Sequence, residues 1–285
     1  MNVLFQLFLN SANVSAKENE TPIFTVSLSL IIIFSIIYFI RSILKDDFQG
    51  EMPDVRNLGS RVVNNYLIPG KDGYILIDTG YSDGFPHFLK KLKEAKINPD
   101  QIKYVFLTHA HDDHAGFLNE VLSITNAKVI LHPKAVDMLK KGESSEEGGC
   151  SSLLAYLFCQ ILELLAKGHG FPPLKTEYYD RLITIDSEEF HALDLPFQVI
   201  ETPGHTEDHI VLLKDGIMFC GDAAMNNFPS IKRVIIWIEN LQKYKKSWEI
   251  ILEANPRIIC PAHGKPFPTS DLKKYLPYLS EIKLR

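Results

Sequence analysis

Three histidines and two aspartates stand within six consecutive positions of this chain. The run reads Thr108-His109-Ala110-His111-Asp112-Asp113-His114-Ala115-Gly116. In an extended segment alternate side chains point the same way, so His109 and His111 can bind one metal ion. Asp113 and His114 then turn towards a second ion. A solvated polar loop is the alternative interpretation, and three further motifs downstream argue against it.

Those motifs each place one metal-binding side chain next to a glycine. They are His205 in TPGHT, Asp222 in GDA and His263 in AHG. Glycine permits the tight backbone that lets a short side chain reach inward. With the first run, the set is large enough for two divalent metal ions that share a carboxylate and leave a position open for water. Nitrogen and oxygen ligands favour zinc, with iron or manganese as alternatives.

Short apolar segments must position these residues, because each candidate ligand follows directly on one of them. Strands are predicted at residues 61–68, 74–77, 104–107, 128–131, 182–185, 197–200, 210–213, 217–220 and 258–260. Helices are predicted between them, notably over 88–95 and 234–252. Side chains at the ends of strands can converge on one rim of a sheet. The pattern therefore indicates an α/β domain with its site at such a rim.

Taken in order after IDTG, the motifs HAHDDH, TPGHT, GDA and AHG resemble the H-x-H-x-D-H pattern of the metallo-β-lactamase superfamily. The resemblance covers roughly residues 60 to 265. It implies a four-layer αββα sandwich of two mixed β-sheets, with both metal ions at one edge.

The resemblance also implies a role for each ligand. The first metal ion would be held by His109, His111 and His205, and the second by Asp113, His114 and His263. Asp222 would bridge the two ions. Asp78, in IDTG, would orient a metal-bound histidine.

Details of the pattern look like glyoxalase II and lactonase relatives, since Asp222 is an aspartate and His114 follows Asp113. Phe117 stands where glyoxalase II usually has a second glycine, and the chain ends soon after His263. We therefore expect a metallo-hydrolase that cleaves a small ester, lactone or thioester rather than a glutathione thioester specifically. A phosphodiesterase of the same fold and a non-catalytic metal-binding module are the alternatives.

The expected nucleophile is a hydroxide formed from water between the two metal ions. Two divalent cations about 3.5–4 Å apart lower the pKa of a shared water to near 7. Asp113 and Asp222 are the expected catalytic residues, Asp113 by orienting the water and accepting its proton. Among the other histidines, His209 is a candidate for substrate contact.

Composition limits the partners. With a formal charge of -5 and a pI near 6.1, the chain has no broad basic surface for phosphate backbones, so no nucleic acid is expected. Its 285 residues suit one catalytic domain that acts on a small-molecule substrate. The oligomeric state stays open.

Residues 23–40, IFTVSLSLIIIFSIIYFI, carry no charge over 18 positions and predict a single-pass transmembrane helix. A buried core helix is the alternative. An N-terminal segment, 1–22, precedes this stretch, and a polar linker, 41–60, leads to the catalytic domain, 61–285. Basic residues are more frequent after the span than before it, which places the domain in the cytoplasm.

Residues 140–180 interrupt the alternation of strands and helices and are predicted to be a helical insertion. This insertion is a helix packed on the core, a lid over the active site or a membrane-contacting surface. Its Tyr156 and Phe158 are the first candidates for an apolar acyl pocket.

Overall fold

The computed structural model describes residues 52–285 apart from residues 53, 146 and 166–169. The chain divides into two units, Met1–Lys45 and Asp46–Arg285, and the described residues belong to the second. The N-terminal segment 1–22, the predicted span 23–40 and most of the linker 41–60 lie outside them. Within the described residues, no helix is long and apolar enough to cross a membrane.

The first of two large sheets has six strands and a mixed topology. In spatial order they are β1 (Arg56–Asn57), β2 (Tyr66–Pro69), β3 (Tyr74–Ile77), β4 (Ile102–Phe106), β5 (Lys128–Leu131) and β7 (Leu182–Thr184). The pairs from β1 to β3 are antiparallel, and those from β3 to β7 are parallel. The strands β2 and β3 form a hairpin around the turn at residues 70–73.

The second sheet has five strands. They are β13 (Phe267–Pro268), β12 (Ile258–Pro261), β10 (Ile217–Gly221), β9 (Ile210–Lys214) and β8 (Gln198–Glu201). Only β10 and β12 pair in parallel, so this sheet is mixed as well. A two-stranded ribbon joins β6 (Gly149–Cys150) to β11 (Trp237–Ile238).

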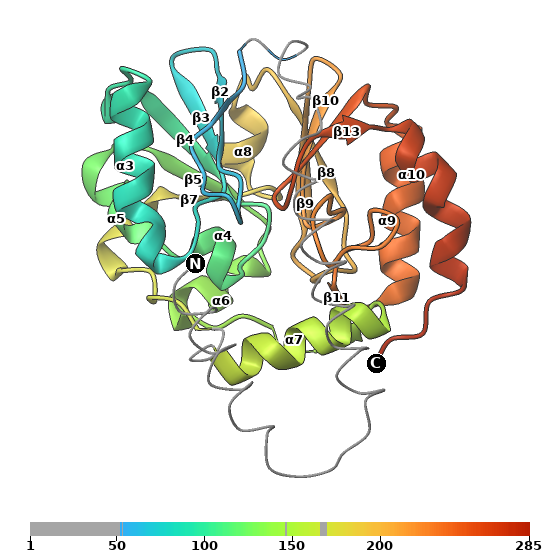
Figure 1. The fold of residues 1–285 in the computed structure, drawn as a ribbon. Helices are drawn as coiled ribbons and strands as arrows, with labels where there is room; N and C mark the ends of the chain where they lie inside the picture. The colour runs from blue at the N-terminus through green and yellow to red at the C-terminus, as the bar shows by residue number, and fades with distance from the viewer. Residues whose placement is uncertain (1–51, 53, 146, 166–169) are drawn as a thin grey trace, which may run out of the picture. The chain divides into compact units, whose positions relative to one another are not determined.

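Helices cover the outer faces of both sheets (Figure 1). The α-helices are α3 (Phe85–Glu94), α4 (Asp112–Ala115), α5 (Leu118–Ile124), α6 (Ala135–Lys141), α7 (Leu153–Leu165), α8 (Glu188–Ala192), α9 (Leu241–Glu253) and α10 (Ser270–Tyr275). The 3-10 helices are η3 (Ser82–Gly84), η4 (Pro99–Gln101), η5 (Thr176–Arg181) and η6 (Leu276–Ser280). Figure 1 shows α3 and α5 beside the first sheet and α9 and α10 beside the second.

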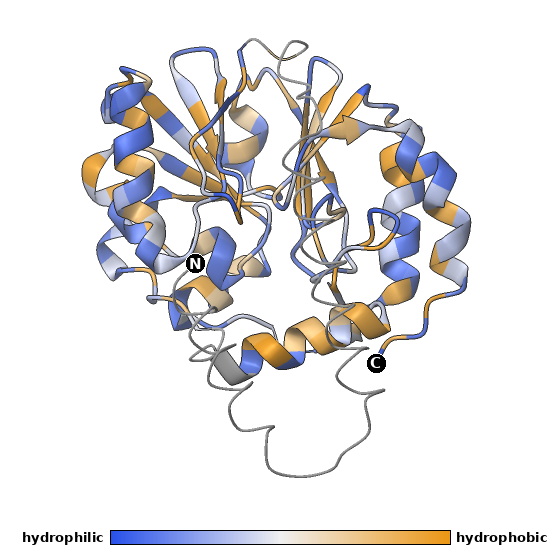
Figure 2. Cartoon of the chain, viewed as in Figure 1, coloured by the Kyte–Doolittle hydropathy of each residue, from blue (hydrophilic) through white to orange (hydrophobic). Residues whose placement is uncertain are grey.

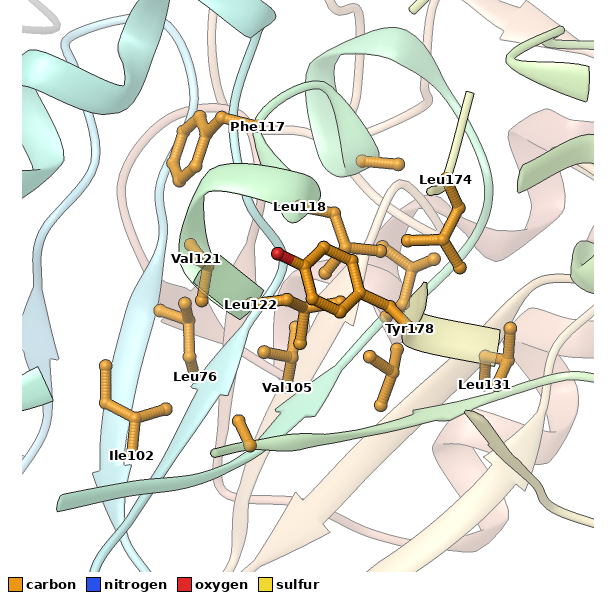
Figure 3. Packing of buried hydrophobic residues seen from close by; sticks show 14 of the residues in the cluster. Leu76, Ile102, Val105, Phe117, Leu118, Val121, Leu122, Leu131, Leu174 and Tyr178 are labelled. Carbon is orange, nitrogen blue, oxygen red and sulfur yellow. The ribbon is translucent and has the colours of Figure 1, made fainter. Parts of the chain in front are cut away.

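Three buried apolar clusters separate these layers, because successive side chains of a strand point to opposite faces. Val105 of β4 packs into the outer cluster beneath α3 and α5 (Figure 3), whereas its neighbour Phe106 packs into the cluster between the sheets. The third cluster fills the space between the second sheet and α9, where Trp248 is fully buried. Two mixed sheets with helices outside them match the predicted αββα arrangement.

Two predicted boundaries are wrong. The domain begins before residue 61, since β1 pairs with β2 and Leu58 is buried in the outer cluster. The predicted helix 234–252 begins only at Leu241, where the Asn240 side chain accepts a hydrogen bond from the Lys243 amide and caps it. Trp237 and Ile238 instead form β11, whose pairing with β6 is not visible in a local apolar pattern.

Candidate metal centre

All the predicted ligands come together, and both sheets contribute. His109 follows β4, His205 follows β8, Asp222 follows β10 and His263 follows β12. The run after His109 is not the extended loop that its alternation predicts, because it turns into α4, with His111 as the residue before its first turn. Asp113 and His114 lie on this short helix.

The first cluster of donors consists of three imidazole nitrogens. Nε2 of His205 lies 3.1 Å from Nε2 of His109 and 3.2 Å from Nδ1 of His111. Three nitrogens bound to one zinc ion at 2.0–2.1 Å in tetrahedral geometry would be separated by about 3.3 Å. The spacing therefore suits a small cation at their centre.

Hydrogen bonds on the far side of two of these rings determine where their protons are. Nδ1 of His205 lies 2.9 Å from the Trp237 carbonyl, which can only accept, so this nitrogen donates and Nε2 carries a lone pair. The Thr108 hydroxyl donates to Asp78, so it accepts from Nδ1 of His109 at 3.0 Å. Two nitrogen lone pairs thus face each other at 3.1 Å with no proton between them, an arrangement that a cation stabilises.

The second cluster contains Asp113, His114 and His263. Nε2 of His263 is 3.1 Å from Oδ2 of Asp113, and Nε2 of His114 is 3.6 Å from Oδ1 of the same carboxylate. Nδ1 of His263 donates to the Val62 carbonyl at 2.9 Å. Nε2 is therefore directed at the site, as in the first cluster.

Asp222 lies between the two clusters. Its Oδ2 is 3.5 Å from Nε2 of His205 in the first cluster. Its Oδ1 is 3.4 Å from Nε2 of His263 and 3.6 Å from Nε2 of His114 in the second. One carboxylate oxygen faces each cluster, which is the geometry required of a bridging ligand.

Asp78 contacts His114 of the second cluster on the side of the ring that faces away from the cluster. Its Oδ2 lies 2.9 Å from Nδ1 of His114, and its Oδ1 accepts a hydrogen bond from the Thr108 amide at 2.8 Å. The structure therefore places Asp78 where the resemblance implies, against a ligand histidine.

The charges of the two clusters differ. Burial lowers the pKa of His109, His111 and His205, that of His111 to about 3, so the first cluster is neutral. Burial also acts on His114 and His263, but the nearby carboxylates outweigh it and raise the pKa of both imidazoles. A metal ion in the second cluster would displace the protons that these rings hold.

The donor set fits divalent cations. Nε2 of His114 and Oδ1 of Asp222 are both buried and have no hydrogen-bond partner. A buried polar atom left unpaired costs about 1–3 kcal/mol, which a bound cation would remove. Nitrogen and carboxylate donors in this proportion suit zinc, iron or manganese alike.

Gly204 and Gly221 directly precede the ligands His205 and Asp222, and each allows its backbone to pass close to a neighbouring segment. Gly204 has φ of 134°, and a Cβ there would lie 2.2 Å from the Tyr244 amide nitrogen. Gly221 has φ of 49°, and a Cβ would lie 2.7 Å from the Thr108 hydroxyl oxygen. A side chain at either position would displace the neighbouring ligand loop.

His209, a candidate for substrate contact from the sequence, is instead buried behind Asp222. Its Nε2 accepts a hydrogen bond from the Asp222 amide at 3.1 Å, and its Nδ1 lies 2.8 Å from the Thr202 hydroxyl oxygen. Asp208 is also buried and accepts from the Ala110 amide at 2.9 Å. Both residues support ligand loops, and only their position just after His205 could have indicated this.

A cavity of about 530 Å³ opens over the two clusters. Its floor is formed by His111, Asp113, His205, Asp222 and His263. Its walls are largely apolar and include Phe158, Leu162, Met225, Phe228 and Ile236. No lysine or arginine is found among the described residues that line it.

Tyr81 also lines this cavity and was not singled out from the sequence. The Asp113 carboxylate raises the pKa of the Tyr81 hydroxyl, so it stays protonated and can donate a hydrogen bond. Its position three residues after Asp78 was the available signal.

Known proteins resemble this chain in sequence and in fold. The chain is 28% identical over 211 residues to metallo-beta-lactamase fold-containing protein ST1585 of Sulfurisphaera tokodaii, a match that spans 70% of this chain and 71% of the relative. The crystal structure of ST1585 superposes with a TM-score of 0.55 at 24% identity, over 79% of this chain and 84% of that one, which shows a shared fold.

Two further relatives are matched over a smaller part of their length. A beta-lactamase-like protein 2 homolog of Drosophila melanogaster is 30% identical over 203 residues, which are 70% of this chain and 58% of that protein. A hydroxyacylglutathione hydrolase of Tolumonas auensis is 28% identical over 172 residues, 60% of this chain and 51% of that protein. The chain thus spans little more than half of these two relatives.

The family model of the metallo-beta-lactamase superfamily matches residues 58–263. That range begins at the buried Leu58 and ends on His263, so it contains every strand end that supplies a ligand. The chain therefore belongs to the metallo-beta-lactamase superfamily, and its fold is that of the superfamily's metallo-hydrolases.

Proposed function

We propose that the protein uses two divalent metal ions to hydrolyse an uncharged ester, lactone or thioester with an apolar acyl group. One observation carries the proposal: the two donor clusters share Asp222 at the floor of a cavity whose walls are apolar. Zinc is the first candidate for both ions, with iron or manganese as alternatives.

Two side chains of the cavity, Asp113 and Tyr81, have roles in this reaction besides the metal ions. When bound by the two donor clusters, divalent cations would supply a water-derived nucleophile at neutral pH and would polarise a substrate carbonyl. Asp113 lies at the cavity floor, where its carboxylate can orient water and take up a proton. Tyr81, protonated at the cavity wall, can donate a hydrogen bond to the substrate oxygen.

The lining of the cavity supports an uncharged substrate. Beyond the ligands, its charged side chains are the acids Asp112 and Glu163, and no basic residue is found among the described lining. Away from the metal ions, a phosphodiester or a substrate with a carboxylate would find no cationic side chain among the described lining. The named activity of the relative from Tolumonas auensis supports a thioester as one member of the substrate class.

We also propose that residues 23–40 span a membrane once and that the catalytic domain lies in the cytoplasm. The absence of charge over 18 residues supports the span, and the basic residues that follow it support the orientation.

Purified full-length protein in detergent, reloaded separately with zinc, manganese or iron, tests the function. We expect turnover of p-nitrophenyl octanoate and of an uncharged lactone or thioester, and little turnover of bis-p-nitrophenyl phosphate. Asp222→Asn and His111→Ala should abolish turnover, whereas His191→Ala, a control at an exposed histidine of α8, should not. A metal-loaded protein that cleaves none of these substrates would support the non-catalytic alternative.

A further inference from the structure

The outer face of α7 is apolar and exposed. Leu153, Leu157 and Ile161 recur every fourth residue and are 55%, 45% and 54% exposed, and Tyr156 lies on the same face. Residues with this spacing form a single stripe along a helix. Figure 2 shows α7 coloured mostly as hydrophobic. Glu163 is the only charged residue in this helix.

Most of the exposed large hydrophobic residues of the described chain lie on this helix. Its eight exposed large hydrophobic residues are Val62, Tyr81, Leu89, Leu153, Tyr156, Leu157, Ile161 and Leu162. Five of them belong to α7, and Val62 and Tyr81 line the active-site cavity. Leu162 belongs to both groups, so α7 also contributes an exposed apolar side chain to the cavity wall.

The opposite face of α7 closes the cavity. Phe158, Cys159 and Leu162 line it, and the Phe158 ring packs edge-on against Phe228, with centroids 5.8 Å apart. Ala155, on the same side, is fully buried. The helix therefore lies between the active-site cavity and any partner that binds its outer stripe.

A lipid bilayer is the occupant that the rest of the chain indicates. Only eleven residues, 41–51, connect the uncharged stretch 23–40 to the buried Met52. Eleven residues reach at most about 40 Å when fully extended. If 23–40 spans a membrane, the domain stays within that distance of its surface.

We propose that the outer stripe of α7 inserts into the membrane surface, so that the acyl chain of a lipid-borne ester or thioester passes along Leu162 and Phe158 to the metal clusters. The substrate class rests on the proposed function, whereas the membrane contact does not. Because α7 has no basic residue, the contact depends on apolar burial rather than on anionic lipid.

Fluorescence quenching in the full-length protein tests the contact. In a Cys159→Ser background the remaining cysteines are buried, so a dye can be attached at Leu157→Cys or Ile161→Cys. The protein is placed in phosphatidylcholine vesicles that contain lipids with a nitroxide on the acyl chain. The matched control is Leu89→Cys, at the exposed leucine of α3.

We expect roughly twofold or greater quenching at positions 157 and 161 relative to position 89, unchanged by 0.5 M salt (about a 4 Å screening length). Equal quenching at all three positions overturns the proposal. So does efficient Ile161→Cys cross-linking between two copies without lipid quenching, because a second copy would then cover the stripe.

Activity gives a second measurement. The double variant Leu157→Gln/Ile161→Gln should lose roughly tenfold or more of kcat/KM for a long-chain ester in vesicles. Its activity on a short, water-soluble ester and its Tm should match those of Leu89→Gln. Quenching without any esterase activity would refute only the proposed function, whereas esterase activity without quenching would refute only the membrane contact.

Discussion

Nδ1 of His114 and Oδ2 of Asp78 lie 2.9 Å apart, and both side chains are almost completely excluded from solvent. Asp78 occupies the left-handed region, with φ of 57°, which is uncommon for a residue other than glycine. Its hydrogen bonds to the Thr108 amide and to His114 hold it there. The end of β3 is thus built to fix the orientation of one ligand ring.

Replacement of Asp78 by asparagine should weaken metal binding in the second cluster by about 10–100-fold, because the ring loses its charged partner. Asparagine also tolerates the left-handed backbone, so the turn itself should persist. Competition titrations with a zinc chelator measure both affinities, and the first cluster should keep its value. Equal weakening in both clusters, or an unchanged second affinity, would contradict the assigned role.

The loss of a ligand from one cluster should remove the metal ion of that cluster and leave the other ion bound. The protein loaded with metal should contain about two equivalents per chain, and His263→Ala and His111→Ala should each retain about one. His263→Ala should also lower turnover far more than it lowers Tm, because the metal serves chemistry rather than folding. Elemental analysis measures the metal content, and activity assays and thermal unfolding measure turnover and Tm. Equal losses of turnover and of thermal stability would indicate a structural metal.

The ligands could be predicted from the sequence because each belongs to a short local motif. The structure brings all of them together. Their supporting partners could not be predicted in the same way. His205 and His263 are oriented by the carbonyls of Trp237 and Val62, and a backbone carbonyl leaves no trace in residue identity. Proximity along the chain makes His209 a candidate for substrate contact, but it does not reveal which face of a loop the ring occupies.

The strands were predictable where apolar segments are four or five residues long, as in β5 and β9. Two-residue strands such as β1 and β11 exist only through pairing with distant partners, and no periodicity can develop over two positions. The apolar residues Val234 and Ile235 suggest a helix, yet they are buried in the cluster over the second sheet. Tertiary packing, rather than local propensity, decides such segments.

Cys159 lines the active-site cavity but should be a poor nucleophile. Burial is the main cause that raises the pKa of its thiol to about 12, and the neighbouring Cys150 adds to it. The thiol is therefore protonated at neutral pH. Alkylation of Cys159 by iodoacetamide should be slow at pH 7.5 and should still accelerate above pH 10, where an ordinary thiol has levelled off. Mass spectrometry of the labelled peptide follows the rate. A plateau near pH 9 would mean an unperturbed thiol.

Deletion of residues 1–45 should release a folded, active domain, since the second unit starts at Asp46 and contains every ligand. The fragment should elute as a defined species without detergent, bind about two metal ions and hydrolyse short esters like the full chain. If residues 23–40 were instead a core helix, deletion would remove buried side chains worth about 1.5–3 kcal/mol each, and the fragment would aggregate. Gel filtration and metal analysis separate these outcomes. Full-length protein that stays in the supernatant without detergent would refute the membrane span, even if the fragment folds.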